Sequence, residues 1–133
     1  MSETKRPTEY FRHVLVVDDD YELTDLLCEV LTYENCVADV AANGMEALDK
    51  LRSNHYEAII CDLMMPRIDG EALHKEVVKL YPYLADKFLF ITGQAARSSG
   101  LADYVVGTGN ALLGKPFEMG EFRAALQELL QRH

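Results

Sequence analysis

Polar and charged side chains stand at the ends of four of the short apolar runs in this sequence. They are Asp18, Asp19 and Asp20 after the first run, Asp62 after the third, Thr92 after the fourth and Lys115 after the fifth. If the first and third runs are neighbouring strands, about 4.8 Å apart, their carboxylates crowd together at an electrostatic cost that a divalent cation relieves. Because carboxylates without a nearby His or Cys favour Mg2+ over Zn2+, we predict a magnesium site.

The same residues could transfer a phosphoryl group. The Asp62 carboxylate is placed to act as a nucleophile and become an aspartyl phosphate. Lys115 could neutralise one phosphoryl oxygen, and Thr92 could donate a hydrogen bond to another. An acidic residue after a strand more often caps a helix, and we assign Asp20 to that role. One such residue indicates little, but residues suited to one chemistry at four strand ends favour a common site.

Two kinds of segment alternate along the chain and would position these residues. Short apolar runs predict strands at His13–Val17, Val37–Ala41, Ala58–Cys61, Phe88–Ile91 and Ala111–Leu113. Apolar residues at helical spacing and turn-forming residues predict helices at Leu23–Leu31, Gly44–Asn54, Gly70–Tyr81, Ser98–Val106 and Phe122–Leu130. Residues 1–11 are polar and without periodicity, so we expect an N-terminal tail followed by one domain over residues 12–133.

This alternation predicts an α/β fold with a doubly wound, five-stranded parallel sheet. Right-handed crossovers would place helices on both faces, and the continuously apolar strands agree with burial on both sides. In such sheets the ligand site lies beyond the carboxyl ends of the strands. The acidic residues, Thr92 and Lys115 would therefore meet in one crevice.

The composition excludes several classes of function. Thirteen basic and 22 acidic residues give a formal net charge of −9 and a pI near 4.8, which disfavours nucleic acid and anionic membranes as partners. The apolar runs are too short to span a membrane and the N-terminus lacks a signal-peptide pattern, so we expect a cytoplasmic protein. Cys28, Cys36 and Cys61 lack metal-site spacing and are expected to be buried free thiols. The four histidines also show no ligand spacing.

Two other enzyme patterns are partly present. Residues 109–115 spell the G-x-x-x-x-G-K part of a P-loop, but Pro116 stands where Ser or Thr should bind Mg2+, and Ala111–Leu113 has the pattern of a strand. A magnesium-dependent phosphohydrolase would use the same acids and lysine, but it ordinarily needs an acid at the position of Met64. We keep the phosphohydrolase as an alternative, together with an interaction module that works without phosphorylation.

Four motifs together resemble the receiver domain of two-component response regulators. They are Val16-Val17-Asp18-Asp19, Cys61-Asp62-Leu63-Met64-Met65-Pro66 with Asp69-Gly70, Ile91-Thr92-Gly93 and Gly114-Lys115-Pro116-Phe117. The resemblance covers about residues 12–131. It implies a flavodoxin-like sheet with the strand order 2-1-3-4-5.

By this resemblance, Asp62 accepts a phosphoryl group from a histidine kinase or a histidine phosphotransfer protein. Thr92 is implied as the switch hydroxyl and Lys115 as the phosphate-binding cation, with a cis bond between Lys115 and Pro116. Such a domain catalyses only its own phosphorylation and dephosphorylation. The implied Mg2+ ligands are the side chains of Asp19, Asp62 and, partly through water, Asp18, together with the backbone carbonyl of Met64.

The chain also departs from the family pattern. Leu112 stands three positions before the lysine, where the family usually has the Tyr or Phe that turns inward on phosphorylation. We therefore expect the output to run through Thr92 and repacking of the fourth helix, with Tyr104 taking part. Met64 and Gln94 occupy the positions that tune the lifetime of the aspartyl phosphate in the family.

The shortened segment over residues 107–115 resembles receivers of hybrid histidine kinases. No output domain follows the receiver pattern in this sequence. We therefore expect the signal to pass to a downstream protein by direct contact, either from a single-domain regulator or from part of a hybrid kinase.

Overall fold

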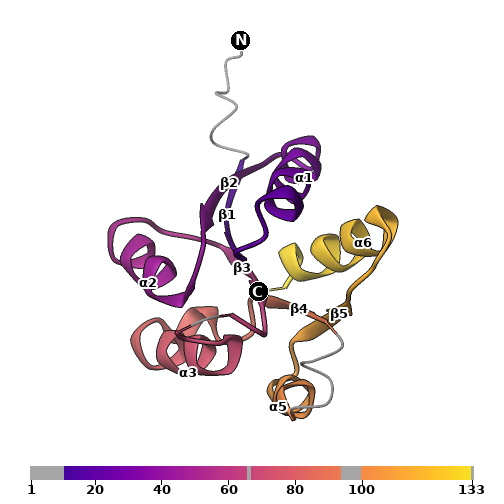
Figure 1. Cartoon of the computed structure of the whole chain (residues 1–133). Coiled ribbons are helices and arrows are strands. Elements are labelled where there is room, and N and C mark those ends of the chain that lie inside the picture. The colour runs from indigo at the N-terminus through magenta and orange to yellow at the C-terminus, as the bar shows by residue number, and fades with distance from the viewer. Residues whose placement is uncertain (1–10, 66, 94–99, 133) are drawn as a thin grey trace.

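The computed structural model describes residues 11–65, 67–93 and 100–132. Within these ranges, five strands form one parallel sheet in the order β2-β1-β3-β4-β5 (Figure 1). They are β1 (Arg12–Val17), β2 (Cys36–Ala41), β3 (Ala58–Asp62), β4 (Phe88–Thr92) and β5 (Ala111–Gly114). The predicted fold and strand order are confirmed, and no strand end differs from its prediction by more than one residue.

Helices cover both faces of this sheet (Figure 1). On one face lie α1 (Tyr21–Tyr33) and α6 (Met119–Leu130). On the other lie α2 (Gly44–Ser53), α3 (Gly70–Leu80) and α5 (Leu101–Thr108). A short 3-10 helix, η2 (Pro82–Leu84), follows α3. The arrangement is the doubly wound one that the alternation of segments predicts.

The helix before β5 ends later than predicted. Its described part runs from Leu101 to Thr108, whereas the prediction ended at Val106, and the predicted residues Ser98 and Ser99 lie outside the described ranges. Gly109 ends the helix with a left-handed φ of 79°, and its N–H donates to the Val106 carbonyl. A glycine in the left-handed conformation after the last turn ends a helix. A glycine inside the helix only lowers the helix propensity of the segment.

The inner strands form the centre of the core. Every residue of β3 and β4 is buried, as is β1 from Val14 onward. By contrast, β5 is half-buried throughout, and β2 is fully buried only at its two ends. The edge strands are therefore less completely buried than predicted. They still pack against the core on both faces, β5 through Leu112 on one side and through Ala111 and Leu113 on the other.

Side-chain caps turn the chain from strand to helix just beyond the carboxyl ends of β1, β2 and β3. Asp20 Oδ1 accepts a hydrogen bond from the Leu23 N–H at 3.2 Å, so its predicted role as the cap of α1 is confirmed. Asn43 caps α2 and Asp69 caps α3 in the same way, each at 2.9 Å. These caps satisfy helix N–H groups that would otherwise lack partners.

Several smaller predictions are also decided by the structure. Residues 111–114 form strand β5, so the P-loop pattern is not a phosphate-binding loop. The bond between Lys115 and Pro116 is cis, as expected. Cys36 and Cys61 are buried free thiols, whereas Cys28 is only half-buried, which corrects the prediction for that residue. None of the helices in the described ranges is both long and apolar enough to cross a membrane.

Candidate functional site

Three carboxylates meet at the carboxyl end of the sheet. Asp18 directly follows β1 and Asp62 ends β3, and these strands pair in parallel with Val17 opposite Cys61. Oxygen atoms of Asp18, Asp19 and Asp62 lie within 4.8 Å of one another. The predicted meeting of these acids is thus present. Asp18 and Asp62 are buried, with 1% and 5% of their surface exposed, and Asp19 is exposed.

Lys115, which directly follows the edge strand β5, closes this acidic cluster at the same carboxyl end of the sheet. Its Nζ lies 3.3 Å from Asp18 Oδ2 and 3.6 Å from Asp62 Oδ2. The backbone N–H of Lys115 donates to the Thr92 carbonyl at 2.7 Å, which anchors the lysine to the end of β4. One cation therefore faces two buried anions. Because Asp19 adds a third carboxylate, the net charge of the cluster is negative.

The surroundings change the proton affinity of the buried Asp18 and Asp62 and of the half-buried Lys115. Burial, and then repulsion by Asp18, raise the pKa of Asp62 to about 6 against the opposing attraction of Lys115. Burial also raises the pKa of Asp18, although the N–H of Asp20 and the charge of Lys115 oppose the shift. Burial would lower the pKa of Lys115, but attraction to Asp62 and Asp18 outweighs it and raises that pKa. The site is thus an arrangement of carboxylates whose mutual repulsion the lysine only partly relieves.

Thr92 and Met64 lie beside the cluster. Thr92 is buried at the end of β4, and its hydroxyl donates to the Gly93 carbonyl at 3.0 Å. The backbone N–H of Met64 donates to Asp62 Oδ1 at 3.2 Å, while its side chain is 44% exposed. Met64 thus helps to orient the carboxylate through its backbone. Gln94, the other position expected to tune the lifetime of the aspartyl phosphate, lies outside the described residues.

A buried polar network that the sequence analysis missed lies between α3, α5 and β4. His74 Nδ1 is 2.7 Å from the Tyr104 hydroxyl, and His74 Nε2 is 2.9 Å from the Ala85 carbonyl. Asn110 also donates to Ala85 at 2.9 Å and accepts from the Phe88 N–H at 3.1 Å. One feature of the sequence could have indicated this network. His74 follows Leu73 and precedes Val77 by three residues, and this spacing places it on the inner face of α3.

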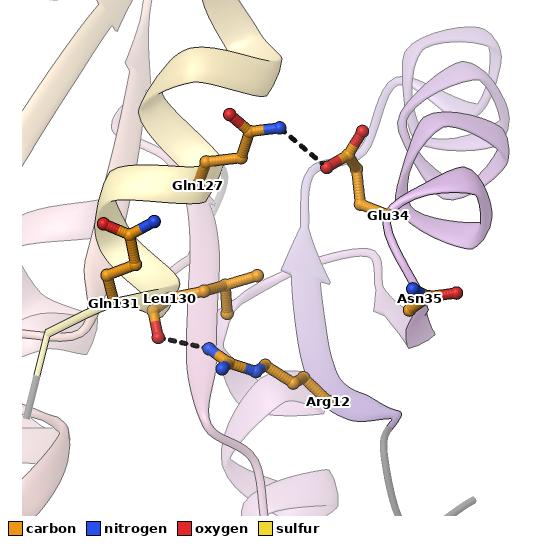
Figure 2. Close-up of a pocket in the computed structure, with 6 residues that line it drawn as sticks. All are labelled: Arg12, Glu34, Asn35, Gln127, Leu130 and Gln131. Carbon is orange, nitrogen blue, oxygen red and sulfur yellow. Dashed lines mark hydrogen bonds between the residues drawn. The ribbon is translucent and has the colours of Figure 1, made fainter. Parts of the chain in front are cut away.

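Two pockets lie near opposite ends of β1. A pocket of about 480 Å3 beside Lys115 is lined mostly by apolar residues of α1 and of the segment after β5, including Leu23, Leu26 and Phe117. Figure 2 shows the other pocket, near the start of β1, where Arg12 donates to the Leu130 carbonyl and Gln127 donates to Glu34 at 3.0 Å. Arg12 and Gln127 are thus already paired within this pocket, which lies away from the acidic cluster.

Comparison with known proteins assigns the chain to a class of protein. The sequence profile described as "Response regulator receiver domain" matches residues 14–127. The chain therefore belongs to the receiver-domain family of response regulators in two-component signalling, as the four motifs indicated.

Similar proteins include response regulators. Response regulator MprA of a Mycobacterium species is 32% identical over 119 residues, which are 90% of this chain and 50% of MprA. A putative response regulator from Chloroflexus aurantiacus has a TM-score of 0.79 at 32% identity, covering 92% of this chain and 99% of that one. TrrA from Thermotoga maritima, solved in complex with Mg2+-BeF, has a TM-score of 0.76 at 32% identity, covering 90% and 100%. The chain spans about half the length of the curated relatives it matches.

Proposed function

We propose that this receiver domain takes a phosphoryl group onto Asp62 from the phosphohistidine of a histidine kinase or a histidine phosphotransfer protein. The observation that carries the proposal is the buried Asp62 carboxylate, which faces Lys115 at 3.6 Å and Asp18 and Asp19 within 4.8 Å. An oxygen of Asp62 attacks phosphorus as the bond from phosphorus to the histidine nitrogen breaks. The imidazole leaves with the electron pair and is protonated.

The residues present fit a magnesium ion. The ligand atoms that the cluster offers are carboxylate oxygens, the type that Mg2+ prefers, and excess negative charge remains after pairing with Lys115. Asp18, Asp19 and Asp62 would hold the ion together with the backbone carbonyl of Met64. Bound there, Mg2+ supplies positive charge that offsets the carboxylates and the phosphoryl oxygens. The Mg2+-BeF complex of TrrA supports this assignment by similarity.

The remaining residues of the site position and stabilise the transferring group. Lys115 is held by its backbone at the end of β4 and neutralises charge on a phosphoryl oxygen. The Thr92 hydroxyl turns from the Gly93 carbonyl to donate to a second phosphoryl oxygen. Met64 offers a thioether where a phosphohydrolase of this chemistry would place an acid, so the domain acts on its own aspartyl phosphate and not on a separate substrate.

The phosphorylated domain passes its signal by contact with a downstream protein in the cytoplasm. The formal net charge of −9 disfavours nucleic acid and anionic membrane as direct partners. Signalling by protein contact requires that phosphorylation change an exposed surface. Leu112 occupies the position of the aromatic residue that usually makes this change in the family, so another residue must do so here. Leu112 packs against the same core cluster as Tyr104, so both respond to any repacking on that face of the sheet.

Tyr104 is expected to change its environment when beryllofluoride, an analogue of the phosphoryl group, binds with Mg2+. Its hydroxyl now pairs with His74 at 2.7 Å, and repacking of α5 would alter that pair. The chain has seven tyrosines, so fluorotyrosine labelling with 19F NMR can follow Tyr104 once a Tyr104→Phe variant identifies its resonance. Tyr33, which is 82% exposed, serves as the unresponsive reference. An unchanged Tyr104 resonance at saturating analogue would rule out this route for the signal.

Intact-mass spectrometry after incubation with acetyl phosphate and Mg2+ tests the proposed function. The wild-type chain should gain the mass of one phosphoryl group, and the gain should disappear with a chelator or with Asp62→Asn. An Asp25→Asn variant, altered at an exposed position of α1, should behave as wild type. Absence of any gain in a wild-type chain that binds Mg2+ would instead support a module that works without phosphorylation.

A further inference from the structure

Gly44, the first residue of α2, lies against the loop that follows Asp62. A Cβ atom on Gly44 would lie 2.7 Å from Ile68 Cβ, 2.9 Å from Ile68 Cγ2 and 3.0 Å from the Ile68 carbonyl oxygen. Real Cβ atoms essentially never approach other atoms this closely, so one of the two segments would have to move. The absence of a side chain at Gly44 therefore sets how near α2 comes to Ile68.

On one side of this contact, Ile68 belongs to a closed loop that begins at the candidate phosphoacceptor. The Gly70 N–H donates to the Leu63 carbonyl at 3.0 Å, which ties the end of the loop to its start. Gly70 also has no room for a Cβ, which would lie 2.9 Å from Leu63 Cα and 3.0 Å from the Asp62 carbonyl oxygen. Because the loop is pinned beside Asp62, a displacement of Ile68 is transmitted toward the Asp62 carboxylate.

On the other side, Gly44 is tied to Asp18. The Asp18 N–H donates to the Ala41 carbonyl at 3.0 Å, and Ala41 ends β2 three residues before Gly44. Two further hydrogen bonds stiffen the turn between them. The Ala42 N–H donates to Glu46 at 2.7 Å, and the Glu46 N–H donates to Asn43 at 2.9 Å. A displacement of Gly44 is therefore transmitted toward Asp18.

We infer that Gly44 is a positioning residue for phosphoryl transfer, because its contact with Ile68 sets how closely the turn after β2, which is bonded to Asp18, approaches the loop that follows Asp62. The inference rests on the proposed function. Relief of the 2.7 Å contact to an ordinary 3.4–4 Å requires a shift of about 1 Å in one of the two segments. Misplacement of that size costs up to about 100-fold in the rate of a reaction that depends on alignment.

A double-mutant cycle between Gly44 and Ile68 tests the inference. Gly44→Ala should slow phosphorylation by acetyl phosphate at least about tenfold at saturating Mg2+ and should weaken Mg2+ binding. The Ile68→Gly background lacks the two nearest atoms, Cβ and Cγ2, and keeps only the carbonyl oxygen at 3.0 Å. There, the same Gly44→Ala change should alter the rate by less than about threefold. This non-additivity is expected only if the two residues act through their contact.

Gly120→Ala is the matched control, because Gly120 is also near the start of a helix but a Cβ there meets no atom within 4 Å. Its rate should equal that of the wild type. Equal rates for Gly44→Ala and wild type, or the same loss in both Ile68 backgrounds, would overturn the inference. If Gly44→Ala does not fold, Ile68→Gly alone should still slow phosphorylation, and a wild-type rate for it would overturn the inference.

If the wild-type chain gains no phosphoryl group, the proposed function is wrong, but the positioning role of Gly44 is still open to test. In that case, Mg2+ affinity measured across the same cycle decides the inference. Coupling between Gly44→Ala and Ile68→Gly in Mg2+ affinity would support it, and additive effects would overturn it.

Discussion

Replacement of Lys115 by alanine should slow phosphorylation of Asp62 by at least about 100-fold. The lysine is the described cation nearest the cluster, with Nζ 3.3 Å from Asp18 and 3.6 Å from Asp62. Removal of a preorganised group that neutralises charge in the transition state costs about 100- to 1,000-fold in rate. The rate of mass gain with acetyl phosphate at saturating Mg2+ measures this effect.

Mg2+ binding separates the role of Lys115 in transfer from a role in holding the metal. The Lys115→Ala variant should bind Mg2+ at least as tightly as the wild type, because the lysine and the ion are both attracted to Asp18 and Asp62 and repel each other. Lys79→Ala removes the same charge from an exposed position of α3 and should leave both measurements unchanged. A Lys115→Ala rate within about threefold of the wild type would contradict the assigned role.

Asp62→Asn should make the folded protein more stable at neutral pH in the absence of Mg2+. Burial, and then repulsion by Asp18, raise the pKa of Asp62 from 3.8 to about 6 in the folded state, so ionisation of this carboxyl opposes folding. Each pKa unit corresponds to about 1.4 kcal/mol, and the shift therefore corresponds to about 2–3 kcal/mol. For a domain of this length, that gain raises the unfolding midpoint by roughly 10 °C.

The pH dependence of this gain follows from the direction of the shift. The folded state binds the Asp62 proton more tightly than the unfolded chain does, so the favourable contribution of the group is complete below pH 3.8 and is lost as the pH rises through about 6. The stability difference between Asp62→Asn and wild type should therefore be small near pH 4 and largest above pH 6. Thermal or urea unfolding with a chelator present, at several pH values, measures it.

An exposed aspartate provides the control for this stability effect. Asp25→Asn should change the free energy of unfolding by less than about 0.5 kcal/mol. Added Mg2+ should narrow the difference between Asp62→Asn and wild type, because it binds the wild-type cluster more tightly and stabilises that folded state. A destabilised Asp62→Asn variant at pH 7.5 without Mg2+ would show that the carboxylate is favourable in the folded state, contrary to its environment in the structure.

The sequence was sufficient to predict the fold and the meeting of the acidic side chains with Lys115. Apolar runs of strand length alternated with helical patterns, and few topologies accommodate that alternation. Because parallel strands end at one edge of the sheet, the positions of Asp18, Asp62 and Lys115 at strand ends were enough to predict that they meet. Asp20 could be predicted to cap a helix and not to join the site, because a cap depends only on residues nearby in the chain.

Other predictions failed where the outcome depended on the surroundings of a residue. Cys28 is only half-buried, and the edge strands β2 and β5 are less buried than their apolar sequences suggested. Apolar residue type reports a tendency to be buried, but the coverage of an edge depends on how its neighbouring helices pack. The end of α5 was likewise mispredicted. Either Gly107 or Gly109 could have adopted the left-handed conformation that ends the helix, and the sequence does not show which one does.

By itself, the sequence determined the element order, the strand ends that carry chemistry and the type of each candidate site residue, because these depend on local patterns and on the geometry of parallel sheets. Only the tertiary structure decided the distances from Lys115 to the two buried acids, the link between His74 and Tyr104, and the close approach of Gly44 to Ile68. Those contacts join residues 24 to 97 positions apart along the chain. Their distances are set by how helices and loops pack on the sheet, which no local pattern specifies.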